Sequence, residues 1–325
     1  MSATSSPMIT PDQLTLRAEL QAGLLASKPH ISPKFLYDEL GSRLFDAICL
    51  LPEYYLTRTE SAIFASNMPH IADCLGQGVC LIEPGAGNCS KAARMFAQWQ
   101  PTQYVAIDIS ATYLDSALQS LRMTQPEIDI LGLGMDFSHE LRLPETVQHE
   151  KRVFFYPGSS IGNFTPSQAL DLLTRMRAAC QPDQVSGILI GVDLRKDTAI
   201  LEAAYDDSLG LTAAFNLNLL RHASGLLEMD VDLNDWRHQA FFNVAHSRIE
   251  MHLLARRDLR LQWRAADSQE MAGRDFAAGS SIHTENSYKY TVQGMQALLR
   301  DAGFAPQQVW QDEKAWFALM YARAI

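Results

Sequence analysis

Hydrophobic positions form short unbroken runs between about residues 79 and 194, and amphipathic stretches separate these runs. Short apolar runs bounded by glycine, proline or polar residues are typical of buried parallel strands, and apolar residues three or four apart are typical of helices. The alternation predicts a doubly wound, mostly parallel α/β sheet. The predicted strands are Val79–Glu83, Tyr104–Asp108, Ile128–Leu133, Val153–Tyr156 and Gly187–Leu194.

The pattern changes after residue 195. The stretch from Asp197 to about Ala223 is predicted to be helical, and hydrophobic residues then alternate with polar ones in Ile249–Leu253 and Leu259–Trp263. A polar turn separates these two segments, so they predict a β-hairpin. The last stretch returns to the first architecture, with a helix over Thr291–Ala302 and a terminal hairpin that closes the sheet.

The N-terminal part gives three weaker patterns. Gln13–Ser27 has helical spacing, and Phe35–Tyr55 is rich in aromatic residues around a glycine and a proline, which predicts short helices and turns. This segment is either a packed arm or a lid over a pocket, because tyrosine offers both a π face and a hydroxyl. Thr57 and Glu60 have capping-box spacing, so we expect a helix that begins there and runs to about Ala72.

A glycine-rich turn follows the first predicted strand. Gly85 and Gly87 lie between that strand and a helix predicted for Ser90–Trp99, and Asp108 closes the second strand. Glycine lets a ligand approach the backbone closely, and a carboxylate at this position can bind ribose hydroxyls. The order of these features favours a nucleotide-type ligand over a purely structural turn.

Two observations bear on which nucleotide is bound. A dinucleotide fingerprint has a third glycine where this chain has Ser90. Glu83 before the two glycines resembles the first motif of S-adenosylmethionine (SAM) dependent methyltransferases, although Cys89 replaces a third glycine that is common there. These methyltransferases also carry the terminal helix and hairpin, which dinucleotide dehydrogenases generally lack. We therefore expect SAM as the cofactor.

Two further strand ends carry candidate residues. Asp136 and Phe137 follow the third strand, where a carboxylate and a ring suit an adenine, although a strand-ending Asp beside a core Phe is an equal alternative. Gly158–Phe164 follows the fourth strand and includes Asn163, which can both donate and accept hydrogen bonds. Open α/β sheets bind ligands at the carboxyl ends of their strands, so we favour a site here over a plain loop.

Composition narrows the class of partner. The formal charge is −10 and no basic run occurs, which argues against nucleic acid or an anionic membrane. No apolar stretch approaches the ~20 residues of a membrane span, and the N-terminus lacks the features of a signal peptide. The five cysteines form no Cys-x-x-Cys pair, and no pattern suggests a metal. We expect a monomer in a reducing cytoplasm that acts on a small molecule.

With these motifs in place, the sequence resembles the histidine Nα-methyltransferases of the ergothioneine pathway. The resemblance implies stepwise methylation of the α-amine of L-histidine by SAM, giving Nα,Nα,Nα-trimethylhistidine (hercynine), in the first step of ergothioneine biosynthesis. The matching stretches run in collinear order to the C-terminal part: Tyr37–Asp46, Leu51–Glu60, Gly85–Asn88, Gly158–Phe164, Gly191–Leu194, Ala204–Asn216, Arg248–Met251 and Thr284–Lys289.

The resemblance also implies roles for individual residues. Those that would hold SAM are Gly85, Lys91, Asp108, Asp136 and Phe137, with Tyr37 and Gly158 beside it. Those that would hold histidine are Tyr54, Asn163, Tyr205, Glu285 and Ser287, with Met251 lining the imidazole pocket. Asn163 and Tyr37 would act closest to the reacting amine. His252 should point away from Met251 in a strand, so we place it outside the site.

Physical chemistry supports these implied roles. Methyl transfer from a sulfonium is an in-line displacement, so catalysis consists mainly of positioning a neutral amine. Glu285 and Ser287 lie two residues apart and would share one face of an extended segment, where they can meet the donor and the acceptor of an imidazole. Tyr37, Phe45 and Tyr54 could hold the methylated cation by cation–π contacts of about 0.5–2 kcal/mol each.

The two domains follow from this organisation. A discontinuous SAM-binding domain would take residues 61–195 and 286–325, and a second, α+β substrate-binding domain would take residues 1–60 and 196–285. The nearest alternative is a SAM-dependent N-methyltransferase acting on another aromatic amino acid or small amine. A SAM-binding protein without catalysis would have little use for the predicted histidine-binding residues. A dinucleotide oxidoreductase would not explain the terminal hairpin.

Overall fold

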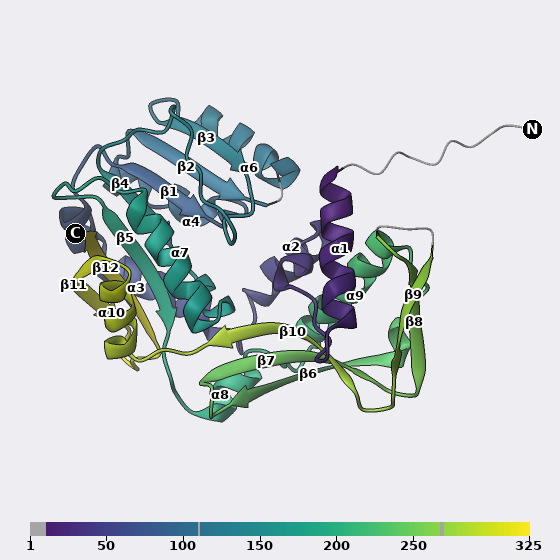
Figure 1. The fold of residues 1–325 in the computed structure, drawn as a ribbon. Coiled ribbons are helices and arrows are strands. Elements are labelled where there is room, and N and C mark those ends of the chain that lie inside the picture. The colour runs from purple at the N-terminus through teal and green to yellow at the C-terminus, as the bar shows by residue number, and fades with distance from the viewer. Residues whose placement is uncertain (1–10, 110, 267–269) are drawn as a thin grey trace, which may run out of the picture. The chain divides into compact units, whose positions relative to one another are not determined.

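A computed structural model of the protein describes residues 11–109, 111–266 and 270–325 (Figure 1). The chain divides into two compact units. Unit 1 comprises residues 1–48, 202–241 and 250–285, and unit 2 comprises residues 49–201, 242–249 and 286–325. Among the described helices, none combines the length and the apolar character that crossing a membrane requires. The assignment of a SAM-binding and a substrate-binding domain stays a prediction.

Unit 2 is built on a seven-stranded sheet of order β11-β12-β5-β4-β1-β2-β3. Strands β1 to β5 pair in parallel. β12 runs antiparallel to β5, and β11 runs antiparallel to β12. The predicted doubly wound sheet with a terminal hairpin is therefore confirmed. Its strands are β1 (Cys80–Pro84), β2 (Gln103–Asp108), β3 (Asp129–Gly134), β4 (Arg152–Tyr156), β5 (Gly187–Asp193), β11 (Phe304–Gln311) and β12 (Phe317–Ala324).

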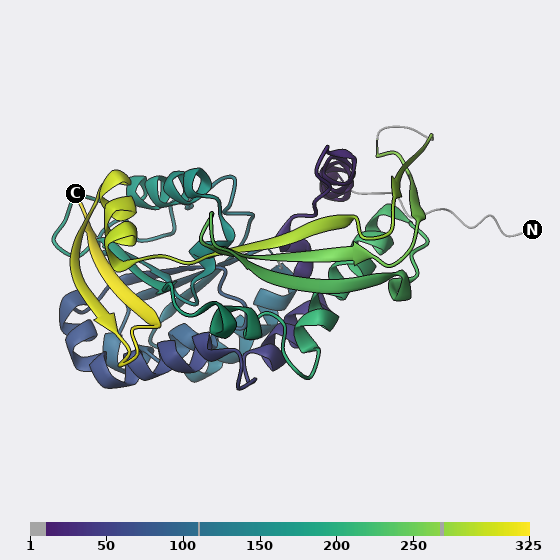
Figure 2. The ribbon, with the colours of Figure 1, turned by 90° about the horizontal axis from the view of Figure 1, so that it is seen from below.

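Helices cover both faces of this sheet, and α7 and α3 lie on opposite sides of it (Figure 2). On one face, Leu172 and Met176 of α7 and Met295 and Leu299 of α10 join a fully buried apolar core. On the other, Phe64 of α3 meets the aromatic residues Trp99 and Phe155 in edge-on or tilted contacts. Burial of each such side chain contributes about 1.5–3 kcal/mol to the free energy of folding. The helices of unit 2 are α3 (Tyr55–Leu75), α4 (Ser90–Ala93), α5 (Phe96–Trp99), α6 (Ala111–Thr124), η2 (Ser160–Asn163), α7 (Pro166–Ala178) and α10 (Val292–Asp301).

Threonine caps two helices of unit 2. Thr165 caps α7 in a capping box with Gln168. The Thr291 hydroxyl accepts from the amide of Gly294 at the start of α10, and Gly303 follows that helix with φ +88°. Ser110, the predicted opening residue of α6, lies outside the described residues. These caps satisfy amide groups that have no partner inside the helix.

Two helix predictions in unit 2 are wrong. The helix expected over residues 90–99 divides into α4 and α5, and it follows Cys89, which takes a left-handed conformation (φ +59°) that glycine adopts more easily. The capping box at Thr57 is absent because α3 already begins at Tyr55. Glu60 is instead buried within α3, where it has stronger partners than a helix terminus offers.

Unit 1 combines helices with two small sheets. The sheets have the orders β10-β7-β6 and β8-β9, and the boundaries between the units fall within β6, β7 and β10. Its elements are α1 (Pro11–Leu25), η1 (Pro33–Leu36), α2 (Glu39–Ile48), α9 (Leu211–Leu227), η3 (Leu233–Asp235), β6 (Trp236–Asn243), β7 (Arg248–Ala255), β8 (Leu259–Arg264), β9 (Met271–Phe276) and β10 (Ser281–Tyr288), and α8 (Thr198–Ala203) crosses the boundary.

Two predictions for this region are corrected. β7 and β8 do not form a hairpin, because β7 lies between β10 and β6 while β8 pairs with β9. The predicted helix after residue 197 is interrupted where the Asp207 carboxylate accepts the amides of Leu211 and Thr212 at 2.9 and 2.7 Å. A new helix, α9, begins there because the Asp207 carboxylate accepts hydrogen bonds from amides that would otherwise need backbone carbonyls of a preceding helical turn.

Candidate active site

The glycine-rich turn is held by the neighbouring strand. The amides of Gly85 and Ala86 donate to the carbonyl of Ile107 at 2.7 and 3.0 Å, and the amide of Gly87 donates to Asp108 Oδ2 at 2.9 Å. Gly85 and Gly87 have φ values of +71° and +53°, in the region that favours glycine. The turn thus places Asp108 directly beside the glycines, as the sequence predicts.

Phe137 lies over this turn. A Cβ added to Gly85 would be 3.7 Å from the Phe137 ring, so the ring and the glycine backbone face each other at contact distance. The neighbouring Asp136 is fixed by Ser138, whose amide donates to Asp136 Oδ1 at 3.1 Å. The structure therefore brings Gly85, Asp108 and the Asp136–Phe137 pair to one edge of the sheet, at the carboxyl ends of β1, β2 and β3.

Glu60 connects three elements of unit 2. Its buried carboxylate pairs with Lys91 Nζ at 2.9 Å and accepts the amide of Gly158 at 2.6 Å. A Cβ on Gly191 would lie 2.4 Å from Glu60 Oε1, so β5 leaves room for this carboxylate only because that residue is glycine. Burial alone would lower the pKa of Lys91, but Glu60 outweighs burial and raises it. Lys91 is thus an ion-pair partner beside Gly158.

A second buried carboxyl group near the glycine-rich turn is that of Glu83, which lies in β1 just before the turn. Its side chain accepts a short hydrogen bond from the Tyr104 hydroxyl at 2.5 Å. Burial raises the pKa of Glu83 to about 8, and the Tyr104 bond only partly opposes this effect. The strand that leads into the glycine-rich turn therefore carries a carboxyl group that holds its proton more strongly than an exposed one.

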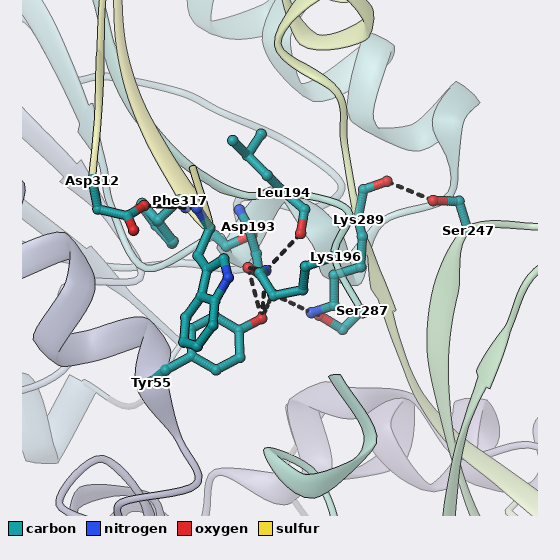
Figure 3. A network of polar contacts seen from close by, with 11 residues as sticks. Tyr55, Asp193, Leu194, Lys196, Ser247, Ser287, Lys289, Asp312 and Phe317 are labelled. Carbon is teal, nitrogen blue, oxygen red and sulfur yellow. Dashed lines mark hydrogen bonds and ion pairs between the residues drawn. The ribbon is translucent and has the colours of Figure 1, made fainter. Parts of the chain in front are cut away.

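A buried polar network centred on Asp193 lies at the end of β5 (Figure 3). The Asp193 carboxylate accepts from Tyr55 at 2.7 and 2.9 Å, from Lys196 at 2.5 Å and from Lys289 at 2.8 Å. Burial lowers the pKa of Lys196 to about 8, although Asp193 opposes the shift. Lys289 also donates to Ser287 Oγ at 2.8 Å, so the network reaches a residue predicted to bind substrate.

The turn that carries Asn163 packs against the same segment. A Cβ on Gly162 would lie 2.9 Å from the backbone oxygen of Tyr288 and 3.5 Å from Ser287 Oγ. The η2 turn can approach β10 this closely only because residue 162 has no side chain. Asn163 and Ser287 therefore come from neighbouring segments of unit 2. Tyr54 directly precedes α3, whose first residue, Tyr55, binds Asp193.

Unit 1 holds Tyr37, which is predicted to lie beside SAM, and the other predicted substrate residues. Tyr37 makes edge-on contacts with Phe45 and Phe215, with ring centroids 5.6 and 5.5 Å apart. Met251 and Glu285 are buried on β7 and β10, respectively. The β10 strand confirms that Glu285 and Ser287 lie in an extended segment.

Tyr205 is fixed through its backbone. Its carbonyl accepts from His238 Nε2 at 2.8 Å, while Asn216 Nδ2 lies 2.9 Å from His238 Nδ1 and 3.1 Å from the carbonyl of His252. A carbonyl only accepts, so the Asn216 amine must face it, and His238 Nδ1 must then accept as well. His238 is neutral in this arrangement, in agreement with the lowering of its pKa by burial.

Known proteins resemble the chain along almost its whole length. The family described as SAM-dependent, histidine-specific methyltransferases matches residues 16–324. A histidine N-alpha-methyltransferase of Mycolicibacterium smegmatis is 35% identical over 312 residues (94% of each chain), and one of Mycobacterium tuberculosis is 34% identical over 313 residues (95% of each). Ergothioneine biosynthesis protein 1 of Neurospora crassa is 29% identical over 295 residues, which cover 85% of this chain and 31% of that protein. The chain belongs to the family of SAM-dependent, histidine-specific methyltransferases.

The residues of this methyltransferase fit the cofactor of its family. Around Gly87, a Cβ would meet no atom within 4 Å, so the turn is open to a ligand on that side. Asp108 supplies carboxylate oxygen beside it, and the Phe137 ring offers an apolar surface next to Asp136. These are the groups that ribose hydroxyls and an adenine ring require.

Sequence reasoning missed four charged residues of the methyltransferase. The sequence pattern presents Glu60 as a capping residue and assigns no role to Asp193, Lys196 or Lys289. One signal is present: Asp193 lies one residue before the end of the fifth predicted strand, close to the position that Asp108 takes in the second. The partners of Asp193 are distant in sequence, except Lys196, so only the fold could identify them.

The first prediction concerns Glu60. Glu60→Gln removes the charge that pairs with Lys91, and we expect the free energy of unfolding to fall by about 1–3 kcal/mol. This loss is smaller than that of breaking a fully buried pair, because the Lys91 side chain is 37% exposed. Thermal unfolding and a SAM titration measure the two effects, and SAM should bind about tenfold more weakly, about 1.4 kcal/mol.

Glu39→Gln is the matched control for this change. Glu39 pairs with Arg43 at 3.3 Å between side chains that are 81% and 69% exposed, so its loss should cost less than about 0.5 kcal/mol and leave SAM binding unchanged. Equal behaviour of the two variants would contradict a positioning role for Glu60.

The second prediction concerns pH. The folded-state pKa of Glu83, about 8, lies above its ordinary value of 4.5, so stability is full below pH 4.5 and falls as pH rises toward 8. The slope can reach about 1.4 kcal/mol per pH unit. Glu83→Gln keeps an acceptor for Tyr104 but does not titrate. The melting temperature of this variant, relative to that of the wild type, should therefore rise as the pH increases from 5 to 8.

The exposed residue Glu145 provides the comparison for Glu83, since its side chain is 98% exposed. Melting curves of Glu145→Gln should run parallel to those of the wild type over the same range. Parallel curves for Glu83→Gln as well would show that Glu83 is ionised at neutral pH and would refute the assignment.

Proposed function

We propose that this methyltransferase transfers three methyl groups in succession to the α-amine of L-histidine and forms hercynine, the first step of ergothioneine biosynthesis. The observation that carries the proposal is the match, over 94% of both chains, to a relative named histidine N-alpha-methyltransferase. The match extends through both units and includes the segment with Glu285 and Ser287.

The proposal assigns a role to each predicted residue. SAM is held by Gly85, Lys91, Asp108, Asp136 and Phe137, with Gly158 and Tyr37 beside it. Histidine is held by Tyr54, Asn163, Tyr205, Met251, Glu285 and Ser287. The protein acts as a monomer on a small molecule in a reducing cytoplasm and binds neither nucleic acid nor membranes, which the net charge of −10 and five free cysteines support.

The chemistry needs little more than positioning. Bound SAM supplies an electrophilic methyl group on a sulfonium sulfur. Asn163 orients the amine through its side-chain carbonyl, which accepts an N–H and leaves the nitrogen lone pair directed away from it. Tyr37, packed against Phe45 and Phe215, offers an aromatic surface as the amine loses its donors and becomes a permanent cation.

Lys289 sets the direction of the hydrogen bond that Ser287 offers to the substrate. An ammonium group can only donate, so Ser287 Oγ accepts from Lys289 Nζ, and the Ser287 hydrogen can be donated to a second acceptor. A neutral imidazole has one such acceptor nitrogen and one N–H. Ser287 therefore donates to the ring, and the Glu285 carboxylate accepts from it, which selects one tautomer of histidine and disfavours rings that lack an acceptor.

A direct assay tests the function. The protein is incubated with SAM and, in separate reactions, with L-histidine, tryptophan, tyrosine or a buffer control, and added methyl groups are counted by mass spectrometry. Three methyl groups on histidine, with much slower reaction of the other amino acids, is the expected result. Preferential methylation of another amine would show that histidine is not the preferred substrate and would contradict the proposal.

The third prediction concerns Lys289. Lys289→Met removes the donor to Ser287 but leaves Asp193 paired with Lys196, so the fold should persist. We expect kcat/KM for histidine to fall at least about tenfold (1.4 kcal/mol), mainly through KM, with SAM affinity unchanged.

Lys196→Met is the matched control, because Lys196 binds the same carboxylate but is not a partner of Ser287. It should lower the melting temperature without a comparable rise in the KM for histidine. If both variants raised that KM equally, Lys289 would act only by stabilising the network and would not orient Ser287.

A further inference from the structure

A cluster of metal-ligating side chains in unit 1 has no role in the function described above. Glu250 and His252 lie two residues apart on β7, and His283 lies on the neighbouring strand β10. One carboxylate oxygen and one ring nitrogen from each histidine all lie within 4.8 Å of one another. The sequence pattern predicts no metal because His283 is far in the chain from Glu250 and His252, and the three match no ligand spacing.

The ring of His252 is fixed at both of its nitrogens. Nε2 lies 3.1 Å from Glu250 Oε2, and Nδ1 lies 3.3 Å from Ser281 Oγ. The ring also stacks on Phe241, with centroids 5.4 Å apart and planes 15° apart. Histidine ligands of metals are commonly held this way, with one nitrogen on the metal and the other bonded to a neighbouring acceptor such as a hydroxyl.

The contact between His252 Nε2 and the Glu250 carboxylate is a hydrogen bond when Nε2 carries the hydrogen, and it can hold a cation when Nε2 carries a lone pair. When Nδ1–H donates to Ser281, Nε2 carries a lone pair, and two lone-pair atoms 3.1 Å apart repel unless a cation lies between them. A proton on Nε2 can play this part, and so can a metal ion. The His283 ring adds a further nitrogen, with its centroid 5.1 Å from that of His252.

The backbone under both histidines is anchored within unit 1. The carbonyl of His252 accepts from the buried Asn216 amide at 3.1 Å. The His283 amide donates to the Pro29 carbonyl and its carbonyl accepts from the Ile31 amide, both at 2.9 Å. These bonds hold the two histidines in place before any ion binds, so little ordering is required on binding.

We propose that Glu250, His252 and His283 bind one divalent first-row transition metal ion, with Zn²⁺ as the best match. Two imidazole nitrogens and one carboxylate oxygen are the donor set that Zn²⁺ accepts, whereas Mg²⁺ and Ca²⁺ prefer oxygen alone. Water completes the coordination. The ion links β7 to β10 next to Met251 and near Glu285, and it stabilises these strands rather than taking part in methyl transfer.

Zinc titration of the intact protein tests this proposal. The protein is freed of affinity tag and of metal, its partly exposed thiols at Cys49 and Cys74 are alkylated, and histidine is omitted because it chelates zinc itself. Competition with the chromogenic chelator 4-(2-pyridylazo)resorcinol should show one Zn²⁺ per chain. His252→Gln and His283→Gln should each weaken binding at least about tenfold, and Ser281→Ala about tenfold.

His149→Gln is the matched control, because His149 is exposed and pairs with Glu145 outside the cluster. It should bind zinc like the wild type. Hydrogen exchange provides a second readout: Zn²⁺ should slow amide exchange in residues 248–255 and 281–288 of the wild type and have no such effect in His252→Gln.

Two results would overturn the site. One is a stoichiometry near zero in the wild type, and the other is unchanged affinity in both histidine variants. All of these measurements are made without SAM and without methyl transfer, so the zinc site can fail while the proposed function stands, or the reverse.

Discussion

The burial of the Asp193 carboxylate constrains much of unit 2. Asp193 has no exposed surface, and taking a carboxylate out of water costs several kcal/mol unless hydrogen bonds and opposite charges replace the water. Tyr55 at the start of α3, Lys196 after β5 and Lys289 after β10 supply these partners. Because one carboxylate binds all three side chains, the start of α3 and the residues that follow β5 and β10 are held close together.

The same constraint connects stability with chemistry. Lys289 is buried to satisfy Asp193, and from this position its ammonium group donates to Ser287. The residue before Tyr55 is Tyr54, a proposed substrate residue. Glu60 plays a similar part near the glycine-rich turn, where it holds Lys91 and the amide of Gly158. The proposed binding residues thus lie beside two buried carboxylates and their partners, which hold side chains more rigidly than exposed loops do.

Two carboxylates near the turn illustrate how local surroundings decide charge. Glu60 lies against an ammonium and a backbone amide, whereas Glu83 has a phenol as its hydrogen-bond partner and a pKa raised to about 8. Burial raises the pKa of Glu83, and its bond to Tyr104 and the charge of Lys91 only partly oppose this effect. A charge at Glu83 would otherwise add to the negative charges of Asp108 and Glu60 beneath the cofactor turn.

The amino-acid sequence by itself determined the parallel sheet, the glycine turn with Asp108, the terminal helix and hairpin, and the family. These features depend on residues close in the chain, whose spacing and conformational preferences are readable directly. Tertiary structure alone decided the rest: β7 pairs with β10 and not with β8, Glu60 binds Lys91 and does not cap a helix, and Glu250, His252 and His283 converge. Each of these outcomes depends on which distant groups compete for one hydrogen bond or one buried charge, and that competition is resolved only when the chain is folded.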